Sequence, residues 1–169
     1  MLKPAATLSL LAFALGACAE QAREQGSYSD PFAYCAAVGT ADKPGAAYTG
    51  KPLPDDVAAA LRQAIGASPD LPAATMTWRC MDGQVYGCTV GANLPCDQKA
   101  DTSRQPSQAV RAFCTAQRDA DAVPASVTGR ATIYAWRCEY GRPKIAQRIA
   151  TPDAQGYLAD IWYPLSPPN

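Results

Sequence analysis

The sequence contains no histidine among its 169 residues. Histidine is the side chain most often used for acid–base catalysis and metal binding near neutral pH. The sequence also lacks the C-x-x-C spacing of thioredoxin-like redox sites and the C-x-x-C-H signature of c-type haem attachment. A G-x-S-x-G elbow, a Walker phosphate loop and an S-x-x-K motif are missing too. We therefore expect a protein that is not an enzyme and that holds no cofactor or metal.

The chain has equal numbers of basic and acidic side chains, and one of the basic ones, Lys3, belongs to the N-terminal segment. Lys3 precedes an apolar run, residues 8–15, that is too short to remain as a membrane-spanning helix. Without Lys3 the chain has 14 basic and 15 acidic side chains, a net charge of −1. This balance predicts no nucleic-acid partner.

The apolar run ends in Leu15-Gly16-Ala17-Cys18, which resembles the lipobox of bacterial lipoproteins. The resemblance implies that residues 1–17 are a signal peptide and that Cys18 receives lipid after cleavage. Ala19, rather than an aspartate, implies the outer membrane, with the protein facing the periplasm. Residues 18–29 are polar and lack apolar periodicity, so we expect a flexible tether before one domain, residues 30–169.

A short motif occurs twice and organises the rest of the chain. Trp78-Arg79-Cys80 recurs as Trp136-Arg137-Cys138, and each copy reads as a half-buried strand that leads to a glycine turn. A second pattern, [YF]-C-x-A-x3-A-D-x6-T-G, begins at Tyr34 and again at Phe113. Together they indicate a duplicated helix–loop–strand unit, with repeat one at 30–96 and repeat two at 107–163. The fold predicted is α+β, a small antiparallel sheet with short helices on one side.

Local signals place the helices and the last strands. Asp30 and Ser107 are N-cap residues for helices that carry the first cysteine of each repeat, and the first helix is expected to run through about Val38. A helix over residues 55–65 has no counterpart in repeat two and is interpreted as an insertion. Alternation predicts strands at 144–150 and 157–163.

Six cysteines remain if Cys18 carries lipid, and an even number in an exported protein favours three disulfides. Sequence alone permits fifteen pairings. If equivalent cysteines pair equivalently, Cys35 joins Cys80 and Cys114 joins Cys138. The two cysteines without equivalents, Cys88 and Cys96, then close a local loop.

The repeated motif also supplies the candidate site residues. Trp and Cys of each motif share one strand face, so both tryptophans are predicted to pack in the core beside a disulfide, although a ligand-stacking role is an alternative. Arg79 and Arg137 point to the opposite face and are predicted to be solvated; they are also the candidates for binding a partner. Asp42 and Asp121 occupy equivalent loop positions, where Asx turns or helix caps explain them without a functional role.

Three functions remain open. The first is a membrane-anchored, non-catalytic envelope lipoprotein that acts as a binding or accessory module, since the chain resembles small cysteine-rich exported bacterial proteins of unassigned function. Residues 78–83 are also similar to the aromatic-x-Cys-x-x-Gly strand of membrane-bound C-type lysozyme inhibitors, which are lipoproteins and small β-barrels. The third is an envelope hydrolase that uses Asp42 and Asp121. The expected partners are the membrane, through lipid, and another envelope protein.

Overall fold

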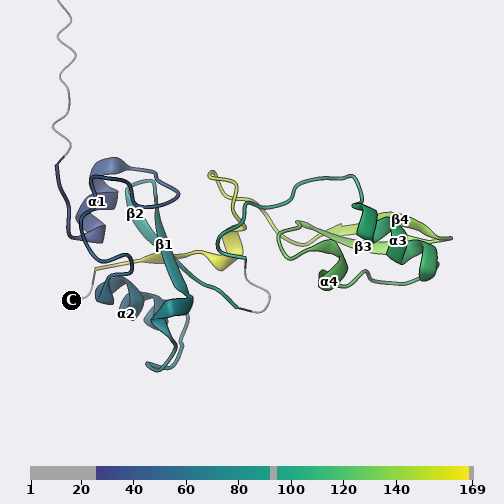
Figure 1. Ribbon diagram of the computed structural model, residues 1–169, viewed down its shortest axis with the longest axis horizontal. Coiled ribbons are helices and arrows are strands. Elements are labelled where there is room, and N and C mark those ends of the chain that lie inside the picture. Colours follow the sequence, from purple (N-terminus) through teal and green to yellow (C-terminus); the bar gives the residue numbers. More distant parts are fainter. Residues whose placement is uncertain (1–25, 92–94, 168–169) are drawn as a thin grey trace, which may run out of the picture.

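The computed structural model describes residues 26–91 and 95–167, which form two lobes arranged end to end (Figure 1). The predicted signal peptide, Cys18 and most of the predicted tether lie outside the described residues. The folded part begins before residue 30, the predicted start of the domain. Tyr28 makes a parallel bridge with Tyr48 and exchanges backbone hydrogen bonds with Ala47 and Thr49, so residues just before 30 already belong to the folded part.

Lobe one consists of residues 26–91 and a C-terminal stretch that returns to it. Its elements are α1 (Pro31–Val38), α2 (Asp55–Ala64), a 3-10 turn (Ala73–Thr75), β1 (Met76–Met81) and β2 (Gln84–Thr89). α1 begins as predicted, because the Asp30 side chain accepts a hydrogen bond from the Ala33 amide and Pro31 occupies the first turn. α2 buries Val57, Ala58 and Leu61, which confirms an inserted helix packed on the core by one apolar stripe.

Lobe two, residues 107–150, repeats this arrangement without the inserted helix. It contains α3 (Gln108–Ala116), a single turn α4 (Ala125–Thr128), β3 (Tyr134–Glu139) and β4 (Arg142–Arg148). Ser107 caps α3 by accepting from the Val110 amide, as predicted. The fold is therefore α+β, with short helices and small antiparallel sheets.

The chain forms two sheets rather than one. β1, β2 and β5 (Tyr163–Leu165) make a three-stranded sheet in lobe one, whereas β3 and β4 make a two-stranded sheet in lobe two. β5 pairs antiparallel with β2, so the C-terminal part of the predicted second repeat belongs to lobe one. We name residues 151–167 the return segment; Figure 1 shows it in yellow, running from lobe two back across lobe one.

The predicted strand 157–163 is wrong. Tyr157, Leu158 and Trp162 are buried, and a 3-10 turn over Ala159–Ile161 lies between them. The turn brings residues five apart to the same side, which an extended strand with period two would not do. Strand pairing starts only at Tyr163, where the chain reaches the edge of β2.

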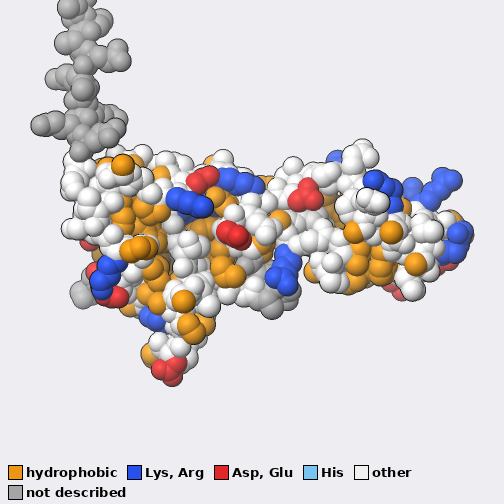
Figure 2. Space-filling view, in the orientation of Figure 1, with side chains coloured by type: hydrophobic (Ala, Val, Ile, Leu, Met, Phe, Trp, Pro, Cys, Tyr) orange, Lys and Arg blue, Asp and Glu red, His pale blue; other side chains and the backbone are white. Residues whose placement is uncertain are grey.

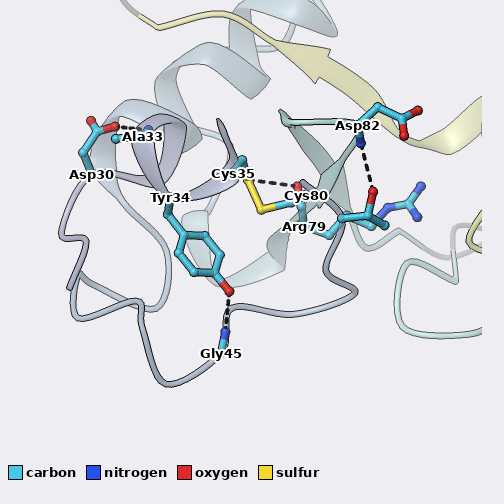
Figure 3. Close-up of a disulfide and its surroundings, with 9 residues drawn as sticks. Asp30, Ala33, Tyr34, Cys35, Gly45, Arg79, Cys80 and Asp82 are labelled. Carbon is cyan, nitrogen blue, oxygen red and sulfur yellow. Dashed lines mark hydrogen bonds between the residues drawn. A yellow bond between two sulfur atoms is a disulfide. The ribbon is translucent and has the colours of Figure 1, made fainter. Parts of the chain in front are cut away.

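The three disulfides are those that the duplication predicted: Cys35–Cys80, Cys114–Cys138 and Cys88–Cys96. The first ties α1 to β1 and the second ties α3 to β3. Figure 3 shows the Cys35–Cys80 bond beside Tyr34, whose hydroxyl accepts from the Gly45 amide at 2.8 Å. Residues 92–94 of the loop closed by the third disulfide lie outside the described residues.

Backbone hydrogen bonds show that the two lobes are copies of one unit. Cys80 N donates to Ala41 O at 2.9 Å, and Cys138 N donates to Ala120 O at 2.8 Å. The residue before each alanine also binds the hairpin turn through its side chain. The Thr40 hydroxyl accepts from the Asp82 amide, and the Asp119 carboxylate accepts from the Tyr140 amide. Each pair of loop positions differs by 79 residues, the offset of the sequence repeat. The duplication is therefore present in the hydrogen bonds as well as in the sequence.

Candidate functional site

Each W-R-C motif lies on the first strand of a β-hairpin. In β1–β2 the turn residues Asp82 and Gly83 have φ of 52° and 80°, and in β3–β4 Tyr140 and Gly141 have φ of 51° and 79°. Two successive positive φ values are typical of the type I′ turn, whose twist matches that of the strands. The hairpins are thus equivalent down to the turn, and each presents tryptophan and cysteine on one face and arginine on the other.

The tryptophans lie in the core, as predicted. Trp78 is 2% exposed, and its indole donates to Pro52 O at 2.8 Å while packing edge-on against Tyr34 and Tyr48. Trp136 is 5% exposed in a separate cluster with Val110, Val123 and the Cys114–Cys138 disulfide. Neither ring is accessible enough to act as a stacking platform for a ligand.

Arg79 departs from the prediction that it would be solvated. It lies on the opposite face from the disulfide, and its side chain leads away from that bond (Figure 3), but it is 0% exposed. Its Nη1 donates to Gln155 Oε1 at 2.8 Å, and its Nη2 forms an ion pair with Asp153. The prediction that Arg79 binds a partner is therefore wrong, because the return segment already covers this side chain.

Aromatic rings complete the enclosure of Arg79. The guanidinium carbon lies 4.5 Å from the Tyr157 ring centre and 4.2 Å from the Trp162 ring centre. Stacking of a weakly hydrated guanidinium between rings is the usual way to bury arginine at low cost. Asp153 is held in place because its other oxygen accepts from the Gln155 and Tyr157 amides. We refer to Arg79, Asp153, Gln155, Tyr157 and Trp162 as the arginine clamp.

Asp42 supports the arginine clamp rather than an Asx turn or helix cap. Its carboxylate pairs with Lys99 and accepts from Gln155 Nε2 at 2.8 Å. Lys99 also donates to Gln155 O at 2.6 Å and lies 3.8 Å from the Tyr157 ring centre. The hydrogen bond from Lys99 is the main cause that lowers the pKa of Asp42, in spite of partial burial, which raises it. The linker between the lobes is thereby fastened to lobe one.

Arg137 has the same strand position in lobe two but a different environment. Its side chain is 51% exposed and forms an ion pair with Glu139 on the same strand. Its cross-strand neighbour is Lys144, and Glu139 pairs in register with Arg142. Facing partners share one side of a sheet, so the outer face of β3–β4 carries three basic side chains and one acidic one. We call Arg137, Glu139, Arg142 and Lys144 the basic face.

The two lobes carry net charges of opposite sign, and lobe two is the positive one. Residues 107–150, lobe two, carry seven basic and three acidic side chains, a net charge of +4. Residues 26–106 and 151–169 carry six basic and ten acidic ones, a net charge of −4. Figure 2 shows lysine and arginine side chains gathered at the far end of lobe two. The near-zero net charge of the chain therefore hides a strong separation, which favours acidic partners at one end.

The other candidate residues are not brought together. Asp42 is engaged beside Ala41 in lobe one, whereas Asp121 follows Ala120 in lobe two, so the pair occupies equivalent places in separate units. Within the described residues there is no group of acidic and cysteine side chains arranged to hold a metal ion. In the same part of the chain, none of the helices has the length and apolar character needed to cross a membrane.

Sequence reasoning missed several residues of both arginine environments. The return-segment side chains Asp153, Tyr157 and Trp162 carry no motif, and their approach to Arg79 depends on where the chain returns in space. The basic face could have been noticed, because residues 142–148 contain three basic side chains in seven positions and no acidic one. Reading that stretch only as a strand hid the charge.

No protein-family model matches the chain, and comparisons with curated proteins and with solved structures give no match either.

Proposed function

We propose that the protein is a lipid-anchored, non-catalytic lipoprotein of the bacterial envelope that acts as a binding or accessory module. Cys18 in its lipobox-like context carries the lipid, and the outer membrane, on its periplasmic side, is the expected location. The single observation that supports binding best is the contrast between the two arginines. The chain covers one copy of the motif with its own residues and leaves the other copy open, in a lobe with a net charge of +4.

The architecture suits such a role. Each lobe has a disulfide between helix and strand, and Cys88–Cys96 adds a third near the junction. Constraints of this kind keep a small core folded outside the cytoplasm without a ligand. The folded part begins at lobe one, so the basic lobe is the end farther from the anchor (Figure 1). That arrangement presents the exposed arginine away from the membrane.

Neither alternative function gains support from the described residues. The lysozyme-inhibitor resemblance implies a small β-barrel, whereas the hairpins form two separate sheets. The hydrolase hypothesis needs Asp42 and Asp121 across one cleft, and Asp42 is already engaged by Lys99 and Gln155. Both alternatives remain measurable: inhibition of lysozyme at micromolar protein, or turnover of envelope glycans lost in Asp42→Asn, would replace the proposal.

Two experiments test the proposal together. Metabolic labelling with radioactive palmitate should label the chain, and Cys18→Ser should abolish the label and release the protein from the membrane fraction. Crosslinking in intact envelopes should then capture a second protein with the wild-type chain. Absence of lipid on Cys18 contradicts the anchor, and a chain that crosslinks to no protein contradicts the binding role.

A further inference from the structure

The strongest clue to a partner is the chemistry with which lobe one covers its own arginine. Arg79 receives a carboxylate from Asp153 and two ring faces from Tyr157 and Trp162. These groups come from one short stretch of chain that crosses the outer face of β1–β2. The return segment is thus a natural example of a ligand bound to the arginine side of a W-R-C hairpin.

Strand register defines the equivalent places in lobe two. Arg79 faces Tyr86, and Arg137 faces Lys144, so the ring beside the first arginine is replaced by a second cation. Thr77, which pairs with Cys88, corresponds to Ala135, which pairs with Gln147 because a bulge shifts the register of β3–β4 between Ala135 and Trp136. Tyr157 and Trp162 pack against Cys88 in lobe one. An aromatic group bound in the same manner to lobe two would therefore lie near Ala135.

A hollow exists at that place. It has a volume of about 230 Å³ and is lined in part by Ala135, Tyr134, Val123 and Ile149. Ile149 is 52% exposed, unusually open for a large aliphatic side chain. Ala135 lies two residues before Arg137 on β3, so its side chain shares the face of Arg137, and the hollow opens beside that end of the face. Val123 and Tyr134 on its inner wall belong to the Trp136 cluster, and Arg130 is the charged residue that lines it. Apolar surface and positive charge are adjacent here, as they are in the arginine clamp.

We infer that the basic face and the hollow at Ala135 form a docking site for an acidic segment of a partner protein that also carries an aromatic side chain. The carboxylate pairs with Arg137 and Lys144, and the ring enters the hollow. This inference rests on the proposed binding function and specifies its surface and the chemistry of its partner. In the part of the chain that the structure describes, no segment covers this face of β3–β4.

Pro143 determines how the partner is held. The Cys138 amide donates to Ala120 and so points away from β4. Cys138 and Pro143 face each other without exchanging hydrogen bonds, so the backbone of Pro143 points away from β3, toward the free edge of β4. The equivalent residue in lobe one is Val85, which pairs with Leu165 of β5. Proline has no amide hydrogen to donate, so β4 resists extension by another strand at this point. Recognition therefore runs through the side chains of the face.

A protein segment fits better than a lipid surface. The described residues begin in lobe one, the lobe next to the proposed anchor, and the basic face lies at the other end of the molecule (Figure 1). A headgroup would supply negative charge but no planar ring for the apolar hollow. The partner's segment supplies both, as the return segment does in lobe one.

The test uses the chain's own return segment as a probe. A synthetic peptide with the sequence of residues 151–165 is titrated into the full mature chain, made with Cys18→Ser so that it carries no lipid, and amide chemical shifts are followed by NMR. We expect saturable shifts in β3, β4 and around Ile149. Arg137→Glu with Lys144→Glu should weaken binding at least tenfold, whereas Lys43→Glu with Lys51→Glu, the same charge change on lobe one, should alter it less than twofold.

Peptide variants separate charge from shape. Replacing the peptide residue at Asp153 by asparagine, or that at Trp162 by alanine, should each weaken binding at least threefold. Shifts confined to lobe one, or binding unaffected by the double charge reversal, would overturn the inference. The inference also fails if phosphatidylglycerol vesicles bind the lobe-two cations and displace the peptide, because the face then recognises lipid charge alone.

The outcomes also separate this inference from the proposed function. A chain that captures an envelope partner equally well with and without Arg137→Glu and Lys144→Glu keeps the proposed function and loses this docking site. A chain that binds the peptide at lobe two but lacks lipid and captures no envelope protein keeps the site and loses the proposed function.

Discussion

Each lobe buries the tryptophan and the disulfide of its W-R-C motif, but only lobe one also buries the arginine. Arg79 is fully enclosed by the return segment, and Arg137 is 51% exposed with one carboxylate neighbour on its own strand. Duplication thus preserved the face that makes the core and left the other face to diverge. A repeated motif is a reliable guide to packing and a poor guide to exposure.

Two substitutions between the lobes explain why the return segment pairs with lobe one. Val85 offers an edge amide to β5, whereas Pro143 at the same position has none. Gly87 makes room above β2: a Cβ there would lie 2.9 Å from Leu165 and 3.1 Å from Leu61. Its counterpart in lobe two is Ile145, which fills its own space against the Trp136 cluster. Lobe two therefore has neither the edge nor the gap that the returning chain needs.

The matched pair Arg79→Ala and Arg137→Ala tests the comparison with the largest expected effect. Arg79→Ala leaves Asp153 buried without its cation and should lower the free energy of unfolding by ~3–5 kcal/mol. Arg137→Ala removes an exposed ion pair and should cost less than ~1 kcal/mol. Urea denaturation followed by tryptophan fluorescence measures both. Equal losses would show that Arg79 and Arg137 contribute equally to stability, in spite of their different burial.

The disulfides give the next largest effect. Replacing both Cys114 and Cys138 by alanine opens a loop of 24 residues and should cost ~3 kcal/mol. Lobe two has a small core and lacks the inserted helix, so we expect it to unfold first, in a transition separate from that of lobe one. Hydrogen exchange should show lost protection in β3 and β4 only. Loss of protection in β1 and β2 as well would mean that the lobes unfold together.

The hairpin turns predict a smaller effect of opposite sign. Tyr140 has φ of 51° and is 83% exposed, so its ring gains little from burial while its backbone is in a region unfavourable for a bulky residue. Tyr140→Asn should stabilise the protein by ~0.5–1 kcal/mol, since asparagine suits the first position of a type I′ turn. Asp82→Asn should change the midpoint of thermal unfolding by much less, because aspartate already suits this turn position. A lower midpoint for Tyr140→Asn would point to a contact role for the ring.

The smallest effect is on the stability of the protein at acidic pH. Lys99 lowers the pKa of Asp42 in the folded state, so the ion pair contributes stability above the unfolded pKa of about 3.9 and loses it as the pH falls through the folded value. Lys99→Gln removes the cause and Asp42→Asn removes the titrating group. Each should make the decline in stability below about pH 4 shallower than in the wild type. An unchanged acid limb in both variants would exclude Asp42 as a contributor.

Local sequence signals predicted the parts of the fold that are decided locally. Asp30 and Ser107 identified their helices because capping is a contact between residues three apart. The disulfide pairs followed from the repeat, because equivalent cysteines meet equivalent helices. Burial of Arg79 could not be predicted, since Asp153 lies 74 residues away and approaches only after the chain has built lobe two. The prediction of a strand at 157–163 was wrong for the same reason, because Trp162 is buried against Arg79 and Tyr157 and not in a sheet.

A photo-crosslinking amino acid placed at one of two equivalent strand positions tests the central claim most directly. Tyr86 faces Arg79 and Lys144 faces Arg137, so the probe samples the same point of the hairpin in each lobe. In intact envelopes, the probe at 144 should yield an adduct with a second protein, and the probe at 86 should react only within the chain, with the return segment. Adducts with another protein at 86 but not at 144, or none at either position, would contradict the assignment of lobe two as the binding lobe.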